Sequence, residues 1–435
     1  MNKSLSLCVI AKDAEKDLAN CLNSVKGLVD QIILIDTGSS DNTKSIARLF
    51  GAKIYDYVWN DNFADARNFS LEKVNTDWVL ILDTDETFVG DKDTINKIIN
   101  QDYQEKIPMY FIDILTYTKE NFDNYDYYQK KIRLFPKSNN ILFENIVAEE
   151  IIHPQGTLNL LGLNAKGLAI KHFLKEGPKS KSKRNVLMLK KQLKKTPDSF
   201  YYNYLMGKEC LQHNLFNKAF SCYQVALDSN DKKDDIYLSE ICTDIIKILY
   251  RQGEKEEALN ECLRREKICQ NNPDFWLTYG YLVLREGDLE TARDSFKKCL
   301  DLDPPAHLIM ISIENITWKP EMMLGYTYLR LKDYENARIY LEKSLGHKDN
   351  QWLLLYYLGI TCKNLKDYNA SETYFKAAEL LVPEEYQQEL KFSILLMHIM
   401  NGKFDKANDI VKSMFDDFDM NENEELSLVD YDIFD

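Results

Sequence analysis

Two short acidic motifs could carry chemistry, because each directly ends a run of apolar residues. The first is Asp36-Thr-Gly-Ser-Ser-Asp41 and the second is Asp83-Thr-Asp85. In an extended strand residues i and i+2 point the same way, so Asp83 and Asp85 would present two carboxylates to one spot while Thr84 faces away. Two hard oxygen donors suit Mg²⁺ or Mn²⁺, which keeps water ligands and takes diphosphate oxygens as further ligands.

The elements that must position these motifs alternate up to about residue 115. Short apolar runs predict buried parallel strands, and the stretches between them predict helices in right-handed βαβ units. Asp41 is expected to cap the second helix. Ligands of open α/β sheets bind at the carboxyl ends of strands, so both motifs should converge there. The expected strands are Leu5–Ala11, Gln31–Asp36, Trp78–Leu82 and a weaker Lys53–Trp59, and the expected helices are Asp13–Lys26, Asp41–Phe50 and Phe63–Asn75.

From residue 200 onward a helical repeat of about 34 residues replaces the strands. Pairs of small residues share a twelve-residue step: Gly207 and Ala219, Gly280 and Ala292, Gly325 and Ala337. Small residues at these offsets let two antiparallel helices approach closely. The spacing resembles the tetratricopeptide repeat, with five or six copies expected. We therefore expect an α/β domain over residues 1–175, a basic linker and helix over 176–198, an all-α repeat domain over 199–415 and an acidic tail over 416–435.

The net charge of −14 is unevenly distributed. Residues 416–435 hold nine of the 69 acidic residues and no basic one, so the remaining 60 acids face 55 bases. Residues 171–195 hold ten basic residues and one acid. This basic segment is either a solvated linker or a surface that faces a phosphorylated ligand. The nearly neutral charge of residues 1–415 argues against nucleic-acid binding. The acidic tail over residues 416–435 should be dispensable for catalysis.

The nine cysteines form no CxxC pair and are odd in number, which indicates free thiols in a reducing compartment. The N-terminal apolar run covers only Leu5–Ala11 and lacks a cleavage site, so no signal peptide is expected. No run of 18 apolar residues exists to cross a membrane. A cytoplasmic location is the resulting expectation.

Three segments within about residues 4–175 resemble family 2 glycosyltransferases of the GT-A fold. They read LSLCVIAKDAEKDLANCLNSV, IILIDTGSSDNTKSIA and WNDNFADARNFSLEKVNTDWVLILDTDE. A fourth segment, IKHFLKEGPKSKSKRNVLMLKKQL, joins the two domains and resembles the glycocin glycosyltransferases. A GT-A domain followed by tetratricopeptide repeats also resembles the glycocin glycosyltransferases, which attach sugar to Cys or Ser of a bacteriocin precursor. The resemblance implies a UDP-sugar donor, with UDP-glucose as default, and a divalent metal, Mg²⁺ or Mn²⁺.

The resemblance implies roles for the matching donor-site residues. Asp36 would hold the uracil or ribose, Arg67 would lie near the diphosphate or sugar, and Asp83 would contact the ribose or donor sugar. Asp85 would bind the metal directly and His172 would be a late further ligand. Other expected donor-site residues are Ala11, Asp13, Thr84 and Arg133.

Several of these residues could instead have a purely structural role. Asp36 could merely cap the next helix, Arg67 could form a surface ion pair, and Arg133 could lie on a solvated strand face. The family often has Asn at the position of Asp13, so a direct contact there is in doubt. A lone histidine such as His172 is usually not a ligand.

The implied reaction is an inverting displacement, which needs a group that accepts the acceptor's proton. Related enzymes with repeats often carry His-Gly-x-Val-His-Glu; here the matching stretch reads Glu-Asn-Ile-Val-Ala-Glu-Glu over residues 144–150. Both histidines are replaced, but an acid remains. Glu149 is therefore the expected base, ahead of Glu150, unless both are surface acids.

Three functions stay open on the sequence. The first is a transferase whose repeats hold a peptide acceptor, since solenoids form extended concave surfaces. The second is a transferase acting on a cell-envelope saccharide, and the third is a repeat scaffold with an inactive transferase domain. The repeats could also mediate a homodimer. No nucleic-acid module is found, because the basic segment lacks interleaved aromatics that would stack bases.

Overall fold

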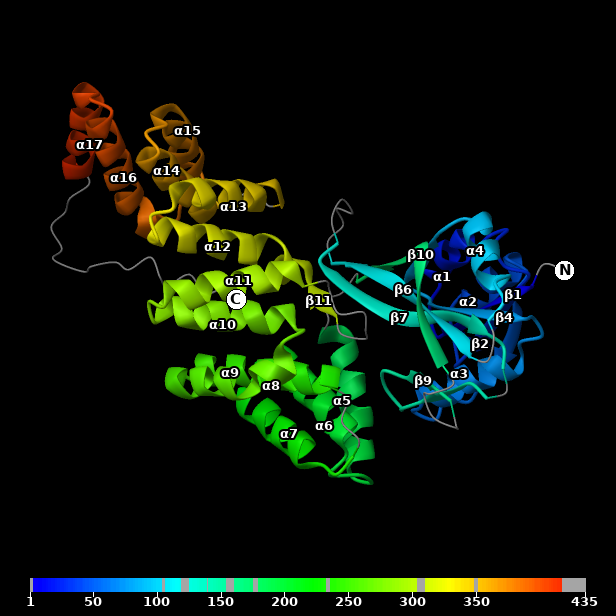
Figure 1. Cartoon of the computed structure of the whole chain (residues 1–435). Coiled ribbons are helices and arrows are strands. Elements are labelled where there is room, and N and C mark those ends of the chain that lie inside the picture. Colours follow the sequence, from blue (N-terminus) through cyan, green and yellow to red (C-terminus); the bar gives the residue numbers. More distant parts are fainter. Residues whose placement is uncertain are drawn as a thin grey trace. The chain divides into compact units, whose positions relative to one another are not determined.

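The computed structural model describes residues 3–103, 106–118, 125–138, 140–153, 160–174, 179–231, 235–302, 310–347 and 351–416. The chain divides into two compact units, residues 1–234 with 306–313, and residues 235–305 with 314–435. The first unit contains a mixed sheet in the order β3-β2-β1-β4-β7-β6-β10-β5, with β11 paired to β7 (Figure 1). Its strands are β1 Leu5–Ala11, β2 Gln31–Asp36, β3 Lys53–Asp56, β4 Trp78–Asp83, β5 Glu86–Val89, β6 Ile107–Tyr117, β7 Tyr127–Pro136, β10 Leu160–Phe173 and β11 Ile311–Ser312; β8 Leu142–Glu144 and β9 Glu150–Ile152 form a separate hairpin.

The parallel half of the sheet confirms the expected βαβ arrangement. β1 pairs in parallel with both β2 and β4, and β2 with β3. β3 ends at Asp56 instead of the expected Trp59, because its ladder partner β2 ends at Asp36. Beyond β4 the pairing becomes antiparallel to β7, and β10 lies between β6 and β5.

Helices cover both faces of this sheet. One face packs against α1 Leu18–Ser24, α2 Thr43–Leu49 and α4 Lys92–Ile99, and the other against α3 Phe63–Glu72 and the β8–β9 hairpin. Trp78, Leu80 and Leu82 of β4 face the first layer, whereas Val79 and Ile81 face the second. This alternation directs Asp83, at the end of β4, toward α3.

Two helices begin later than the sequence predicts. α1 starts at Leu18 and not at Asp13, because Asp13 has φ 48° and its carboxylate accepts a hydrogen bond from the Ser40 amide at 2.7 Å. α2 starts at Thr43, where Asp41 accepts from the Thr43 amide at 2.9 Å. The predicted cap at Asp41 is therefore wrong, since Asn42 holds that position.

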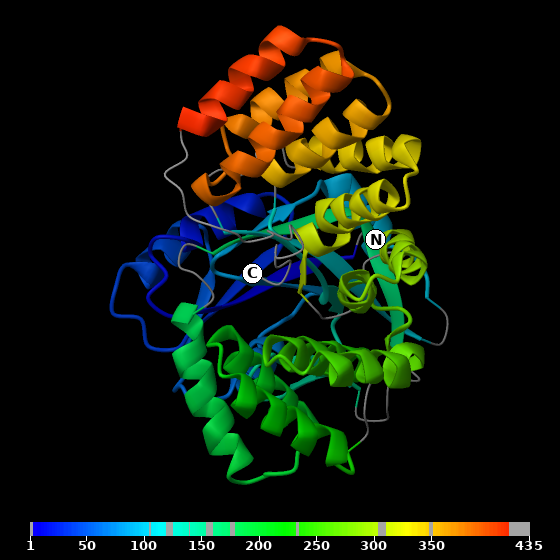
Figure 2. The same ribbon diagram turned by 90° about the vertical axis from the view of Figure 1, so that its left-hand side faces the viewer.

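The rest of the described chain is helical and forms the expected repeats (Figure 2). Gly207, Gly280, Gly325 and Gly359 each face a large side chain sixteen residues later, at distances that leave no room for a Cβ atom. The helices are α5 Lys179–Leu193, α6 Phe200–Gln212, α7 Phe216–Asp228, α8 Asp235–Arg251, α9 Lys255–Cys269, α10 Pro273–Arg285, α11 Leu289–Asp301, α12 Trp318–Arg330, α13 Tyr334–His347, α14 Trp352–Asn364, α15 Tyr368–Glu379, α16 Gln387–Met400 and α17 Phe404–Asp416, with 3₁₀ turns η2 Ile313–Ile316 and η3 Glu384–Tyr386.

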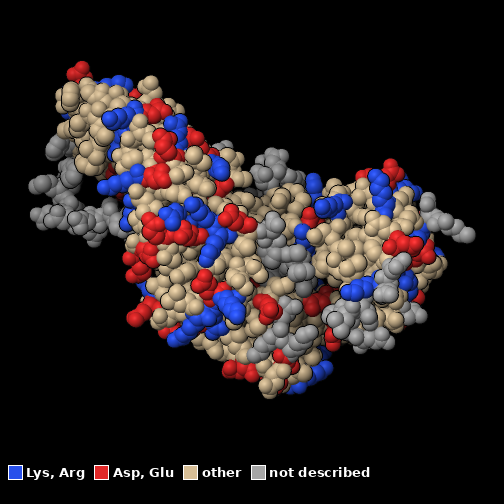
Figure 3. All heavy atoms as spheres, in the orientation of Figure 1, with Lys and Arg blue, Asp and Glu red and all other residues tan. Residues whose placement is uncertain are grey.

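Charge and cysteine placement agree with the sequence analysis where the structure describes them. Basic and acidic side chains are interspersed over the repeat helices on the visible face (Figure 3). All nine cysteines are unpaired. Within the described ranges no helix is both long and apolar enough to cross a bilayer. The acidic tail after residue 416 lies outside the described residues.

Candidate active site at the carboxyl ends of the parallel strands

The two carboxylates of the Asp83-Thr84-Asp85 motif have different partners, since Asp83 pairs with Arg67 and Arg133 whereas Asp85 lies beside His172. β4 ends at Asp83, residues 84 and 85 form a turn, and β5 begins at Glu86. Strand alternation therefore does not decide where Asp85 points, because alternation applies only to extended backbone. Asp83 lies on the α3 side of the sheet, and Asp85 lies beside the end of β10.

Asp83 is the centre of a cluster of buried charges. Arg67 of α3 pairs with its Oδ1, and Arg133 of β7 lies 3.3 Å from its Oδ2. Arg133 also donates to Glu86 Oε1 at 2.6 Å, while Glu86 Oε2 accepts from the Asp83 amide at 2.8 Å. Arg67 and Arg133 are 3% and 6% exposed, so neither the surface ion pair nor the solvated strand face considered for them is correct.

The arginines decide the protonation of this cluster. The Asp83 side chain keeps 43% of its surface accessible, and the partial desolvation of its carboxylate alone would raise its pKa. The charges of Arg67 and Arg133 outweigh that effect and hold the pKa well below its usual range. At Glu86 burial dominates and raises the pKa despite the opposing charge of Arg133.

Asp85 and His172 form the part of the site that could hold a metal ion. His172 Nε2 lies 3.5 Å from Asp85 Oδ2, and both side chains are 21% exposed. The other ring nitrogen, Nδ1, lies 3.3 Å from Thr116 Oγ1, so a tautomer that donates there leaves Nε2 free to coordinate. A carboxylate oxygen and an imidazole nitrogen side by side fit a divalent cation.

The protein would leave most positions around such an ion open. No group of three or more His, Cys, Asp or Glu side chains in the described ranges is arranged to hold a metal. Two protein ligands leave room for waters and phosphate oxygens, which is how Mg²⁺ is commonly bound.

Two of the residues expected at the nucleotide, Ala11 and Asp36, are the last residues of β1 and β2. Asp36 is 1% exposed and accepts from the Gly38 and Ser39 amides at 3.2 and 3.1 Å, and Lys44 lies 3.2 Å away. Burial would raise the pKa of Asp36, but these partners lower it below the usual range. Ala11 is buried, and its carbonyl accepts from the Thr37 amide at 2.9 Å. Hydrogen bonds within the protein thus hold the ends of both strands and the loop that follows β2.

The candidate base Glu149 lies next to the Asp83 cluster. It directly precedes β9, its side chain is 17% exposed, and its Oε1 accepts from Arg67 Nε at 3.0 Å. Arg67 therefore joins Glu149 to Asp83. Glu150 belongs to β9 and lines the same small cavity. Neither acid is a plain surface residue.

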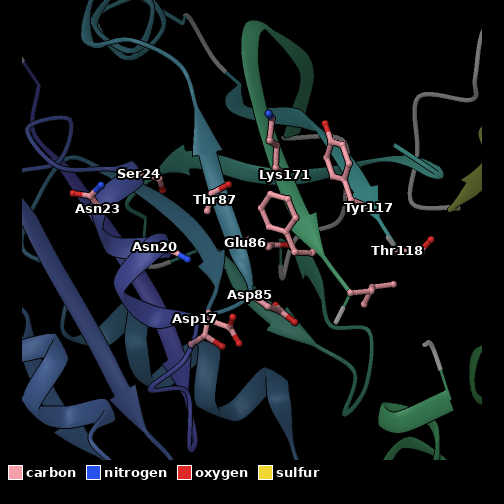
Figure 4. Close-up of a pocket in the computed structure, with 13 residues that line it drawn as sticks. Asp17, Asn20, Asn23, Ser24, Asp85, Glu86, Thr87, Tyr117, Thr118 and Lys171 are labelled. Atoms are coloured by element: carbon pink, nitrogen blue, oxygen red, sulfur yellow. The ribbon is translucent and has the colours of Figure 1, made fainter. Parts of the chain in front are cut away.

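Two cavities flank the motif. The larger, of about 870 Å³, is lined by Thr84, Asp85 and Glu86 on one side and by residues of α1 on the other. Figure 4 shows Asp17 and Asn20 facing Asp85 across it. The smaller, of about 190 Å³, lies on the α3 side and is lined by Asp83 and Glu149 among others. The larger cavity has the volume typical of small-molecule sites.

Sequence reasoning missed two charged residues of this site. Glu86 is 3% exposed and binds Arg133; its position directly after Asp85 was a signal for a third acid in the motif. Lys131 lines the smaller cavity, and burial lowers its pKa. Only the pairing of β7 with β4 brings Lys131 here, which no local pattern predicts.

Comparisons with known proteins agree with this architecture. Residues 6–153 match Glycosyl transferase family 2, and residues 273–305 and 322–347 match the tetratricopeptide repeat. An uncharacterized glycosyltransferase of Rickettsia typhi is 31% identical over 130 residues, 30% of this chain and 38% of that protein. The SPbeta prophage-derived glycosyltransferase SunS of Bacillus subtilis is 25% identical over 209 residues, 46% of this chain and 48% of that protein.

The repeat region has relatives of its own. A TPR repeat-containing protein of Synechococcus elongatus is 45% identical over 85 residues, 20% of this chain and 21% of that protein. The chain thus spans between about a fifth and a half of the length of these relatives.

Proposed function

We propose that this chain, which joins a family 2 glycosyltransferase domain to C-terminal tetratricopeptide repeats, transfers a sugar from a UDP-sugar to a peptide. One observation carries the proposal: His172 Nε2 lies 3.5 Å from Oδ2 of Asp85, a residue that lines a cavity of about 870 Å³ and is two positions from Asp83 of the Arg67–Asp83–Arg133 cluster. Two possible metal ligands, Asp85 and His172, and the two buried arginines lie at the carboxyl ends of the strands, an arrangement that suits an anionic nucleotide donor.

Asp85 and His172 would hold a divalent ion, Mg²⁺ or Mn²⁺. Such an ion, when bound, stabilises negative charge on the departing diphosphate. Arg67 and Arg133 fix the Asp83 carboxylate, whose remaining lone pairs would accept hydrogen bonds from donor hydroxyls. Asp36 and Ala11 shape the loops beside the nucleotide.

The reaction is a single inverting displacement. The acceptor's Sγ or Oγ forms a bond to the anomeric carbon as the bond from that carbon to the diphosphate oxygen breaks, and the electron pair leaves with UDP. The acceptor's proton passes to Glu149 Oε2, since Oε1 is occupied by Arg67. A cysteine thiol would demand less of this base, because its pKa is about 8.5 and its thiolate is a strong nucleophile.

The repeats support a peptide as acceptor. Stacked helical hairpins form extended concave surfaces that can bind peptides. The resemblance to glycocin glycosyltransferases also favours a peptide acceptor. On the face shown in Figure 3, charges of both signs are interspersed over the repeat helices, so this face does not select for a polyanion.

Donor turnover tests the proposal. The full chain is incubated with UDP-glucose or UDP-N-acetylglucosamine and Mn²⁺, and released UDP is measured. We expect release that Asp85→Asn abolishes, whereas Asp91→Asn, which retains the N-cap of α4, leaves it unchanged. Full release by Asp85→Asn would contradict the metal role, and absence of release and of UDP binding in the native chain would favour an inactive scaffold.

Product masses then identify the acceptor class. The chain and donor are mixed in parallel with Cys- and Ser-containing peptides and with soluble oligosaccharides, and intact masses are recorded. Addition of sugar to peptides alone supports the proposal, whereas addition to oligosaccharides alone would replace it by the saccharide alternative.

A further inference from the structure

The loop that carries Glu149 is held by a helix of the repeat region. This loop joins β8 to β9 and spans residues 145–149. On α6, the Tyr201 hydroxyl donates to the Ala148 carbonyl at 2.7 Å, and the Tyr202 hydroxyl lies 3.5 Å from Asn145 Oδ1. All of these residues belong to the same compact unit.

The Ala148 carbonyl is a specific place to hold this loop. It belongs to the planar peptide unit whose nitrogen is that of Glu149, so a bond to this oxygen fixes the plane from which the Glu149 side chain departs. The side chain has its own anchor at Arg67 Nε, 3.0 Å from Oε1. Glu149 is therefore restrained from two sides, by α3 through its carboxylate and by α6 through its backbone.

The backbone of this loop needs such restraint. Asn145 has φ 75° and Ala148 has φ 52°, in the left-handed region that alanine rarely adopts because its Cβ crowds the following carbonyl. Conformations of this kind persist where surrounding contacts enforce them. On the α3 side the Phe63 amide donates to the Ile146 carbonyl at 3.1 Å. Contacts from α3 and α6 together hold a loop that would otherwise relax.

We infer that Tyr201 is a positioning residue, which acts through the Ala148 carbonyl to place the Glu149 carboxylate for proton transfer. This inference rests on the proposed function, in which Glu149 is the base. It also gives the first repeat helix a role in the transferase site beyond any binding of the acceptor. Tyr201 touches neither donor nor acceptor in this account.

Removal of one hydroxyl tests the inference. Tyr201→Phe should lower kcat for UDP release from UDP-glucose about fivefold, as expected for the loss of one hydrogen bond, with KM for the donor unchanged. Tyr340→Phe makes the same chemical change on α13 and should have no effect. In hydrogen exchange, the backbone of residues 142–152 should lose protection in Tyr201→Phe alone.

A double-mutant cycle separates positioning from general destabilisation. In a Glu149→Gln background, Tyr201→Phe should lower kcat no further, because the base it places is gone. An equal fivefold loss in both backgrounds, or no loss in either, would overturn the inference while native turnover still supports the proposed function. Absence of turnover in the native chain would instead count against the proposed function itself.

Discussion

His172 lies directly opposite Glu86 in the antiparallel pairing of β10 with β5, and this register brings its Nε2 to within 3.5 Å of Asp85 Oδ2. His172 and Asp85 are 87 positions apart in the sequence. Their juxtaposition depends on β10 entering the sheet between β6 and β5. A carboxylate from the β4–β5 turn and an imidazole from a late strand thus lie side by side, which is the pair that the proposed function assigns to the metal ion.

Replacement of His172 should weaken metal binding and leave the fold intact. His172→Gln keeps a polar side chain but removes the imidazole nitrogen, so we expect Mn²⁺ affinity to fall by about tenfold or more. The measurement is the Mn²⁺ concentration that gives half-maximal UDP release. His213→Gln, on the repeat side of the unit, serves as the matched control. An unchanged Mn²⁺ requirement in His172→Gln would remove His172 from the ligand set.

Loss of Arg67 should destabilise the α/β domain strongly. Arg67→Met leaves Asp83 and Glu149 without a shared counter-charge. Breaking a buried ion pair costs about 3–5 kcal/mol, and we expect the lower end of this range because the Asp83 side chain is 43% exposed. Urea unfolding of the full chain measures the change in the free energy of unfolding. Arg264→Met removes a surface pair whose arginine is 63% exposed and should shift the free energy of unfolding by no more than about 0.5 kcal/mol. Equal effects of the two substitutions would contradict the buried cluster.

The Asp83 cluster predicts a loss of stability in acid. Because the native pKa of Asp83 is lowered, its contribution is fully present above the unfolded-state pKa of about 3.9 and disappears as the pH falls toward the lower native value. The free energy of unfolding of the native chain should therefore fall more steeply below about pH 5 than that of Asp83→Asn. Parallel pH profiles of the two proteins would show that Asp83 has no such role.

The sequence predicted the framework of the site better than its connections. The bounds of β1 and β2 agree with the expected Leu5–Ala11 and Gln31–Asp36, because buried parallel strands have continuous apolar sequences that can be recognised locally. The contacts of Arg133 with Asp83 and Glu86 were not predictable, since they depend on which strand lies beside β4. Long-range pairing of this kind leaves no local pattern.

The different partners of Asp83 and Asp85 show a second limit of prediction from the sequence. The apolar run predicts an extended strand but does not say at which residue it stops, and the turn at residues 84–85 changes where Asp85 points. The start of α1 was misplaced for a related reason. Side chains of the loops after β1 and β2 bind each other, as Asp13 binds Ser40, and this long-range contact prevails over local helix preference.

The repeat interpretation makes a paired prediction about two glycines. A Cβ atom at Gly280 would lie 2.7 Å from the Phe296 ring, whereas a Cβ at Gly346 would meet nothing within 4 Å. Gly280→Ala should therefore cost about 1–3 kcal/mol through overpacking. Gly346→Ala, within α13, should stabilise by about 0.5–1 kcal/mol because alanine favours the helix. Thermal unfolding of both variants measures the difference, and a neutral Gly280→Ala would contradict close packing of α10 on α11.

The central claim is that the site at the carboxyl ends of the parallel strands binds a nucleotide together with a divalent metal, which Asp85 would ligate. Calorimetric titration of UDP into the native chain and into Asp85→Asn, each with and without Mn²⁺, tests it without knowledge of the acceptor. We predict that Mn²⁺ strengthens UDP binding to the native chain and has no such effect on Asp85→Asn. Binding of UDP that is equally strong in all four titrations, or absent from all of them, would contradict the claim.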